Sequence, residues 1–206
     1  MPCPRRTGLA RSDPVFELGW ILRLFLWGIE GWNCMGSALA SAPLFPTGVD
    51  TMSEAIERVR RALIEAGHAD TIAAFAEGTH TAAEAAASVG CSVAQIAKSI
   101  VFRSADTPIL VVASGANRVD RNKAGQALGR KVERADPDWV RDVTGFAVGG
   151  VAPTGHLTQP LILIDEDLLA LDALWAAAGS PTHAFRTTPA DLVKLTGGIV
   201  ADVKAV

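Results

Sequence analysis

The chain is organised around the stretch Val148-Gly149-Gly150-Val151-Ala152-Pro153-Thr154-Gly155-His156. Three glycines, a proline and a histidine among nine residues do not suit the interior of a helix or a strand, because glycine tolerates unusual backbone angles and proline removes a hydrogen-bond donor. The stretch therefore predicts a rigid loop with exposed backbone N–H groups, which suit a small polar ligand. The alternative is an ordinary connection between two strands.

The residues that follow this loop argue against a phosphate-binding P-loop. Gly150 and Gly155 have the glycine spacing of G-x-x-x-x-G-K-[ST], but His156 and Leu157 stand where that motif has lysine and serine or threonine. Pro160 would also block the helix that follows such a loop. We therefore do not expect a P-loop ATPase.

Composition and charge narrow the class of protein. The chain has 206 residues, 49% of them hydrophobic and 20% charged, which predicts one globular domain with a sizeable core. Its net charge of −3 argues against a general nucleic-acid coat protein but is compatible with a local basic face for RNA. Three cysteines without a C-x-x-C pair indicate a reducing compartment, and we expect a cytoplasmic protein. The four histidines have no metal-binding spacing, so no metal and no other cofactor is expected.

Residues 1–50 differ from the rest and form a predicted N-terminal extension ahead of a domain at residues 51–206. Three arginines precede an apolar run over residues 15–29, which is the outline of a signal peptide. Two charged residues interrupt that run and it is too short for a membrane span, so stable membrane insertion is not expected. The extension is a poorly ordered leader, an interfacial amphipathic helix, or sequence upstream of a start at Met52. The first and third are favoured because a strong helix signal follows Met52.

Local signals in the body predict short helices that alternate irregularly with strands. Capping patterns and helical spacing place helices at residues 51–67, 81–90, 92–95, 120–129, 136–143, 166–178 and 188–197. Runs of β-branched and apolar residues place strands at residues 99–102, 108–113, 131–134, 161–164, 183–187 and 199–203. The first two strands are expected to form a hairpin. This order predicts a mixed sheet of the α/β or α+β class rather than a doubly wound parallel sheet.

Lys98 is the first candidate for chemistry. It falls where a helix signal gives way to a strand, in otherwise apolar surroundings. A lysine beside a cleft can hold an ester or a phosphate as a compact positive donor, and burial would depress its pKa and make it a candidate base. The alternative is a lysine whose stem packs against the protein while its ammonium reaches water.

Two histidines and a serine are further candidates. His156 follows the glycine loop and His183 lies in Ser180-Pro181-Thr182-His183, and either histidine can act as a general base or orient another group. Ser180 can hydrogen-bond a substrate, although a serine after a helix-terminal glycine commonly belongs to a turn. The sequence contains no G-x-S-x-G pattern that would indicate a serine hydrolase.

The most basic stretch begins at Arg118 and ends at Arg134, and it holds six basic side chains. Arg118, Arg121 and Lys123 are candidates for binding an RNA backbone with salt-sensitive affinity. An ordinary solvated helix face is the alternative.

Taken together, these segments resemble the YbaK-like, or prolyl-tRNA-synthetase-associated, editing domain family of aminoacyl-tRNA deacylases. The resemblance is collinear over about residues 53–206, and residues 1–50 have no counterpart in it. The segments that carry it are Gln95-Ile96-Ala97-Lys98-Ser99-Ile100-Val101-Phe102, Arg118-Val119-Asp120-Arg121-Asn122-Lys123, Thr144-Gly145-Phe146-Ala147-Val148-Gly149-Gly150-Val151-Ala152-Pro153, Leu163-Ile164-Asp165, Ala178-Gly179-Ser180 and Pro189-Ala190-Asp191-Leu192.

The resemblance implies a compact α/β domain with a mixed, partly barrel-like sheet surrounded by helices. By position, Lys98 matches the functional lysine of the family. The loop from Gly149 to Pro153, with Gly150, Val151 and Ala152 inside it, matches the family's G-x-x-x-P loop, which holds the 3′-terminal adenosine and the aminoacyl ester. The stretch around Ser180 and His183 matches a variable wall that helps to sort amino acids. His183 stands in a wall where other members carry an acidic residue, so the preferred amino acid stays open.

The activity that the resemblance implies is hydrolysis of the ester that joins a wrong amino acid to tRNA. We expect a free-standing trans-editing enzyme acting on mischarged aminoacyl-tRNA, with proline tRNA carrying a wrong small amino acid as its substrate and an aminoacyl-tRNA synthetase as a further partner. The alternative is a non-catalytic tRNA- or synthetase-binding module of the same fold. A small membrane-associated protein is a third hypothesis, which depends on residues 15–32 alone.

Overall fold

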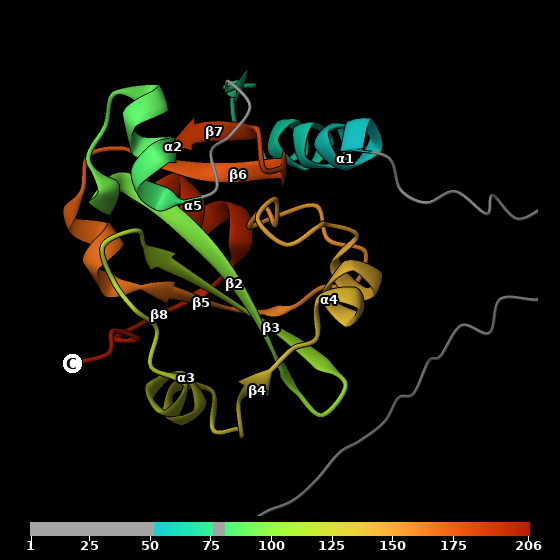
Figure 1. Ribbon diagram of the computed structural model, residues 1–206, viewed down its shortest axis with the longest axis vertical. Coiled ribbons are helices and arrows are strands. Elements are labelled where there is room, and N and C mark those ends of the chain that lie inside the picture. Colours follow the sequence, from blue (N-terminus) through green and yellow to red (C-terminus); the bar gives the residue numbers. More distant parts are fainter. Residues whose placement is uncertain (1–51, 76–80) are drawn as a thin grey trace, which may run out of the picture. The chain divides into compact units, whose positions relative to one another are not determined.

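The computed structural model describes residues 52–75 and 81–206 of the chain. Within these ranges, eight strands form one mixed sheet with five α-helices around it (Figure 1). The predicted extension at residues 1–50 lies outside the described residues. In the described ranges, none of the helices combines the length and the apolar character that crossing a membrane requires.

The sheet has the strand order β1-β7-β6-β2-β3-β5-β8, and β4 pairs with β2 off this path. The strands are β1 (Ile72–Ala74), β2 (Ile96–Ser104), β3 (Thr107–Ser114), β4 (Glu133–Arg134), β5 (Leu161–Asp165), β6 (Leu174–Ser180), β7 (His183–Thr187) and β8 (Ile199–Ala201). The β2–β3, β2–β4, β6–β7 and β1–β7 pairs are antiparallel, whereas β2–β6, β3–β5 and β5–β8 are parallel. The predicted mixed α/β sheet is therefore confirmed.

The helices begin and end close to the residues that their capping signals predicted. They are α1 (Met52–Glu65), α2 (Ala82–Val89), α3 (Arg121–Leu128), α4 (Pro137–Thr144) and α5 (Pro189–Thr196), with two 3-10 helices, η1 (Val93–Gln95) and η2 (Glu166–Ala170). At the start of α2, the Thr81 hydroxyl accepts a hydrogen bond from the Glu84 N–H at 3.2 Å, and the Glu84 carboxylate accepts one from the Thr81 N–H at 2.8 Å. Such reciprocal bonds satisfy two donors that a helix end leaves unpaired.

Strand β3 separates two hydrophobic cores. Successive side chains of a strand face opposite sides of its sheet, so Leu110 and Val112 join the core that contains residues of α1, α4 and α5. Ile109 and Val111 join the second core, to which α3 contributes. All four side chains are fully buried, which explains why this strand is almost continuously apolar.

The predicted helix at residues 166–178 is wrong. Leu168 and Trp175 instead belong to different elements, because the 3-10 helix η2 ends at Ala170 and strand β6 begins at Leu174. The alanine-rich run that looked helical forms an antiparallel hairpin with β7 and a short parallel ladder with β2. Pairing on both edges outweighs the helix preference of alanine, because tertiary context overrides intrinsic propensity. Strand β1 was not predicted, since its three residues carry too short a pattern.

Candidate active site

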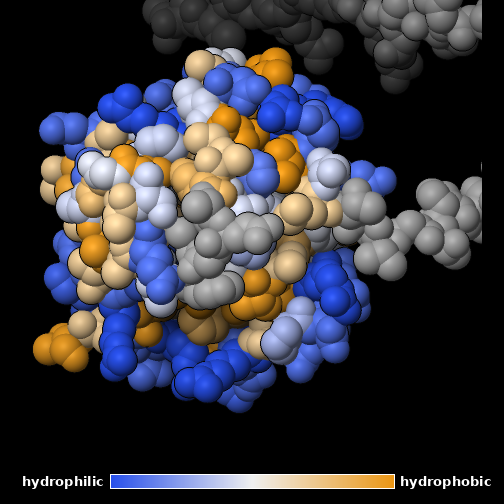
Figure 2. All heavy atoms as spheres, turned by 45° about the horizontal axis from the view of Figure 1, so that its top comes forward, coloured by the Kyte–Doolittle hydropathy of each residue, from blue (hydrophilic) through white to orange (hydrophobic). Residues whose placement is uncertain are grey.

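A cavity of about 270 Å³ lies beside the first half of β2. Its walls come from α2, β2, the glycine loop before β5, and the β6–β7 hairpin. Phe75, Val89, Ile96 and Trp175 contribute apolar surface. Figure 2 shows the face of the domain that carries α2, β6 and β7, where apolar side chains gather near the middle and hydrophilic ones lie mostly toward the rim. The polar side chains that line the cavity are Thr81, Lys98, Ser99, Ser180 and His183.

The cavity lies at a gap in the pairing of β2. One edge of β2 pairs with β3 along its whole length. The other edge pairs with β6 only at Ile96 and Ala97 and with β4 only at Phe102 and Arg103. Between these two contacts, residues 98–101 have no strand partner on that edge within the described part of the chain. The backbone polar groups of this segment that point to the unpaired edge are therefore available to a ligand.

Lys98 stands at this gap with its ammonium held by backbone oxygens. Its Nζ donates hydrogen bonds to the carbonyl oxygen of Gly115, at 3.3 Å, and to that of Asn117. Burial lowers the pKa of Lys98; the nearby Asp165 carboxylate opposes this shift and Arg118 adds to it. An ammonium has three N–H donors, so two bonds to carbonyl groups leave one donor for a ligand in the cavity.

Only part of the glycine loop lines the cavity. Gly149, whose φ is 91°, and Val151 line the cavity. Gly150 packs against the backbone of Ser180, and Ala152 is fully buried in the core that contains residues of α1. The structure therefore brings Lys98 and part of the predicted loop to a single cavity. Ala152 does not line the cavity and instead packs in the core.

Ser180 and His183 form a hydrogen-bonded pair in the wall of the cavity that adjoins the glycine loop. The Ser180 Oγ lies 2.8 Å from His183 Nδ1, and the Thr182 hydroxyl lies 3.1 Å from the same nitrogen. The β6–β7 pairing shifts register between Ala177 and Ser180, and such irregularities are common next to functional sites. Ser180 is almost completely buried, so its side chain has a fixed position. The pair therefore places two polar groups in a largely apolar wall.

His156 is not among the residues that line the cavity. Its ring packs edge-on against Phe146, with 5.5 Å between the ring centroids, and its Nε2 is buried without a hydrogen-bond partner in the described part of the chain. Burial lowers the pKa of His156 to about 4, a hydrogen bond to the Ala152 backbone opposes that shift, and the Arg58 charge adds to it. This environment suits a neutral packing residue behind the loop.

The three predicted RNA-binding residues lie on or beside α3, outside the cavity lining. Arg118 and Arg121 are exposed. The Lys123 ammonium instead donates to the Asp202 carboxylate at 2.6 Å. The basic segment therefore presents two exposed guanidinium groups and one lysine that already has an acidic partner.

Ser99 lines the cavity and was not among the predicted site residues. Its Oγ is buried and has no hydrogen-bond partner among the described residues. The Gly115 N–H donates to the Ile96 carbonyl oxygen at 2.6 Å, so the backbone groups of even-numbered β2 residues point toward β3. Those of Ser99 therefore point toward the free edge. A serine directly before the apolar run Ile100-Val101-Phe102 was the available signal.

No group of three or more potential metal-ligating side chains occurs among the residues that the structure describes. The chemistry that these residues offer is thus a cation at the cavity edge, backbone N–H groups of a glycine loop, and hydroxyl and imidazole groups on an apolar wall. Such a site can hold a small ligand with an apolar part and a polar, negatively polarised end.

Comparisons with known proteins show which family this chain is similar to. The family profile described as an aminoacyl-tRNA editing domain matches residues 76–195. The uncharacterized protein YwhH of Bacillus subtilis (strain 168) is 32% identical over 138 residues, which cover 66% of this chain and 88% of that protein. A proline–tRNA ligase of Pelotomaculum thermopropionicum is 26% identical over 130 residues, 63% of this chain but only 22% of the ligase. The solved structure of a candidate trans-editing enzyme for prolyl-tRNA synthetase is 43% identical, with a TM-score of 0.72, and the match covers 76% of this chain and 100% of that one.

Proposed function

The chain belongs to the aminoacyl-tRNA editing domain family, and we propose that it hydrolyses the ester of mischarged tRNA in trans. The observation that carries this proposal is that Lys98, Gly149 and Val151 line one cavity. An aminoacyl ester is already an activated bond. Its hydrolysis therefore requires mainly that the ester is held, that a water or the ribose hydroxyl is positioned, and that the developing oxyanion is stabilised.

Lys98 acts in this proposal as a fixed positive donor for the phosphate or ester end of the substrate. The carbonyl oxygens of Gly115 and Asn117 carry partial negative charge and attract the ammonium form more strongly than the neutral amine. A compact ammonium with one unused donor suits the binding of an anionic or polarised oxygen. Action of Lys98 as a general base is the second choice, because it would require loss of the proton that these bonds stabilise.

The loop beside Lys98 would cradle the acyl group. Gly149 adopts a backbone conformation that residues with side chains rarely adopt, and Val151 lines the cavity next to it. Backbone N–H groups that are fixed before the substrate arrives stabilise an oxyanion without reorganising. Ser180 and His183, which also line the cavity, would contact the amino-acid side chain.

The substrate that these features favour is proline tRNA carrying a wrong small amino acid. The cavity is small, and Trp175 and Phe75 occupy part of its wall, so larger side chains would be excluded by size. The similarity to part of a proline–tRNA ligase and to the candidate trans-editing enzyme supports the choice of tRNA and of a synthetase as partner. Such an enzyme would work in the cytoplasm.

A panel of mischarged tRNAs tests the proposal. We expect wild-type protein to deacylate at least one of them and Lys98→Ala to lose roughly 100-fold or more in kcat/KM, the usual effect of removing one oxyanion-stabilising donor. Lys194→Ala is the matched control, since Lys194 is an exposed lysine of α5 outside the cavity.

Two outcomes would contradict the proposal. If wild-type protein binds tRNA but hydrolyses none of the esters, the non-catalytic binding module is the better description. If Lys98→Ala and Lys194→Ala are equally active, Lys98 does not act in the reaction.

A further inference from the structure

We propose that Asn117 and Asp165 are positioning residues that hold the Lys98 ammonium at the edge of the cavity. This inference rests on the proposed deacylase function, because it assigns a role in that reaction to residues that do not line the cavity. Asn117 would hold Lys98 directly through its carbonyl group, and Asp165 would act by fixing Asn117.

The Asn117 carbonyl belongs to a turn that contacts the Lys98 ammonium. Residues 114–117 form the turn that follows β3, and the Asn117 N–H donates to the Ser114 carbonyl oxygen at 2.9 Å. The Lys98 ammonium donates to the carbonyl oxygens of Gly115 and Asn117 in this turn. The place of the Lys98 charge therefore depends on the conformation of a turn 17 and 19 residues away in the sequence.

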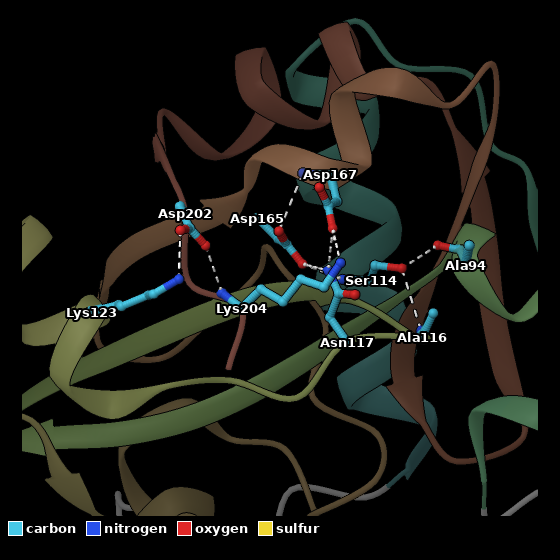
Figure 3. Close-up of polar contacts among 9 residues, drawn as sticks. All are labelled: Ala94, Ser114, Ala116, Asn117, Lys123, Asp165, Asp167, Asp202 and Lys204. Carbon is cyan, nitrogen blue, oxygen red and sulfur yellow. Dashed lines mark hydrogen bonds and ion pairs between the residues drawn. The ribbon is translucent and has the colours of Figure 1, made fainter. Parts of the chain in front are cut away.

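The side chain of Asn117 fixes that turn. It is buried, and its Nδ2 donates to the Asp165 Oδ2 at 2.7 Å and to the Asp167 Oδ2 at 2.8 Å (Figure 3). One amide group thus joins the turn after β3 to two carboxylates at the end of β5 and the start of η2. Loss of this amide would free the turn and the carbonyl that it presents to Lys98.

The side chain of Asp165 is fully buried. Its Oδ2 also accepts a hydrogen bond from the Ser114 N–H at 3.1 Å, and its Oδ1 accepts one from the Asp167 N–H at 3.2 Å. A buried carboxylate is costly unless such donors and a positive charge compensate it. The same negative charge raises the pKa of Lys98, against the larger effect of burial.

The ion pair between Lys204 and Asp167, at the exposed side of these hydrogen bonds, provides a control variant. Lys204 donates to the Asp167 Oδ2 at 3.1 Å, and both of these side chains are about half exposed. Lys204 thus touches the same network without contacting Lys98. Its removal should leave the turn, the Lys98 ammonium and the reaction unchanged.

NMR of lysine-labelled full-length protein measures the Lys98 side chain directly. The chain has only five lysines, Lys98, Lys123, Lys131, Lys194 and Lys204, so Lys98→Met and Lys204→Met assign their two ε-carbon signals by loss of a peak. We expect Asn117→Ala to shift the Lys98 signal and to lower kcat/KM for a mischarged tRNA by roughly 10- to 100-fold, as misplacement of a substrate-holding group does. Binding of uncharged tRNA should stay within about twofold, because the exposed basic residues are unchanged.

Asp165→Asn is the second variant and covers the case in which Asn117→Ala does not fold. It keeps the size of the side chain, removes its charge and presents an amide to the donors of Ser114 and Asn117. We expect the same direction of change in the Lys98 signal and in kcat/KM, whereas Lys204→Met should match wild-type protein in both.

The outcomes separate this inference from the proposed function. The inference is overturned if the Lys98 signal does not move in the folded variants, or if it moves while kcat/KM stays within twofold of wild type. If wild-type protein hydrolyses no mischarged tRNA, the proposed function is wrong and with it the catalytic part of this role. The NMR signal would then still decide whether Asn117 anchors Lys98.

Discussion

Gly150 and Ser180 meet backbone to backbone. A Cβ built on Gly150 would lie 2.6 Å from the Ser180 Cα and 2.8 Å from its carbonyl carbon, distances that folded proteins essentially never show. This contact joins the glycine loop to the end of β6 and so brings Gly149 and Ser180 to the same cavity. The absence of a side chain at position 150 is therefore a condition for the geometry of the site.

We predict that Gly150→Ala lowers both stability and activity. The methyl group must push the loop away from β6, and overpacking of this kind costs roughly 1–3 kcal/mol. Thermal or denaturant unfolding and kcat/KM for a mischarged tRNA measure the two effects. Gly129→Ala is the control, because Gly129 has a φ of 62° but open space around its Cβ position. It should lose about 1–2 kcal/mol from backbone strain and keep its activity. A Gly150→Ala protein with wild-type stability and kcat/KM would show that the contact is not required.

Ser99→Ala should lower activity without lowering the stability of the fold. The Ser99 hydroxyl is buried without a partner in the described structure, and an unsatisfied buried group costs roughly 1–3 kcal/mol. Its removal should leave the free energy of unfolding unchanged or higher, while kcat/KM falls about tenfold through loss of a substrate hydrogen bond. Ser104→Ala, at the far end of the same strand, should change neither quantity. Full activity in Ser99→Ala would mean that the hydroxyl does not contact the substrate.

The stability of the fold should fall between pH 6.5 and pH 4 because of His156. Its pKa is lowered in the folded protein from 6.5 to about 4, so the unfolded chain binds a proton in this range and the folded chain does not. Stability is therefore fully present above pH 6.5 and decreases as the pH falls toward 4, by up to about 3 kcal/mol. Denaturant unfolding across this range should show a weaker pH dependence in His156→Leu than in wild type. Equal slopes in the two proteins would contradict the assigned environment.

Arg121 and Lys123 should differ in their contribution to tRNA binding. Arg121 is exposed, whereas the Lys123 ammonium is already bound to Asp202. If α3 contacts the tRNA backbone, Arg121→Ala should reduce the slope of log K against log salt by about 0.7–0.9, the value for one lost phosphate contact. Lys123→Ala should reduce it by less. The salt dependence of binding to uncharged tRNA measures both slopes. An unchanged slope in Arg121→Ala would place the tRNA elsewhere on the protein.

Local chemistry in the sequence was sufficient for most elements of the fold. Thr81 with Glu84 and Asp136 with Pro137 mark helix starts, because capping groups act on backbone donors within three residues. The apolar β2–β3 hairpin was predicted for a similar reason, since its partners are joined by a short turn. Residues 166–178 were assigned wrongly. The part from Leu174 onward is a strand because it pairs with β2 and β7, which no local pattern records.

By itself, the sequence determined the mixed class of the sheet, and it identified two candidates for chemistry, Lys98 and the irregular glycine loop. Only the tertiary structure decided which of these residues meet. It placed Lys98, Gly149 and His183 around one cavity and left His156 behind the loop. It also joined Lys98 to Asn117 and Asp165 through a turn and a parallel strand. The physical reason is the sequence separation over which each interaction acts. Caps and turns act within a few residues, so the local sequence records them. A cavity depends on strand order and on packing between segments that are far apart in the chain.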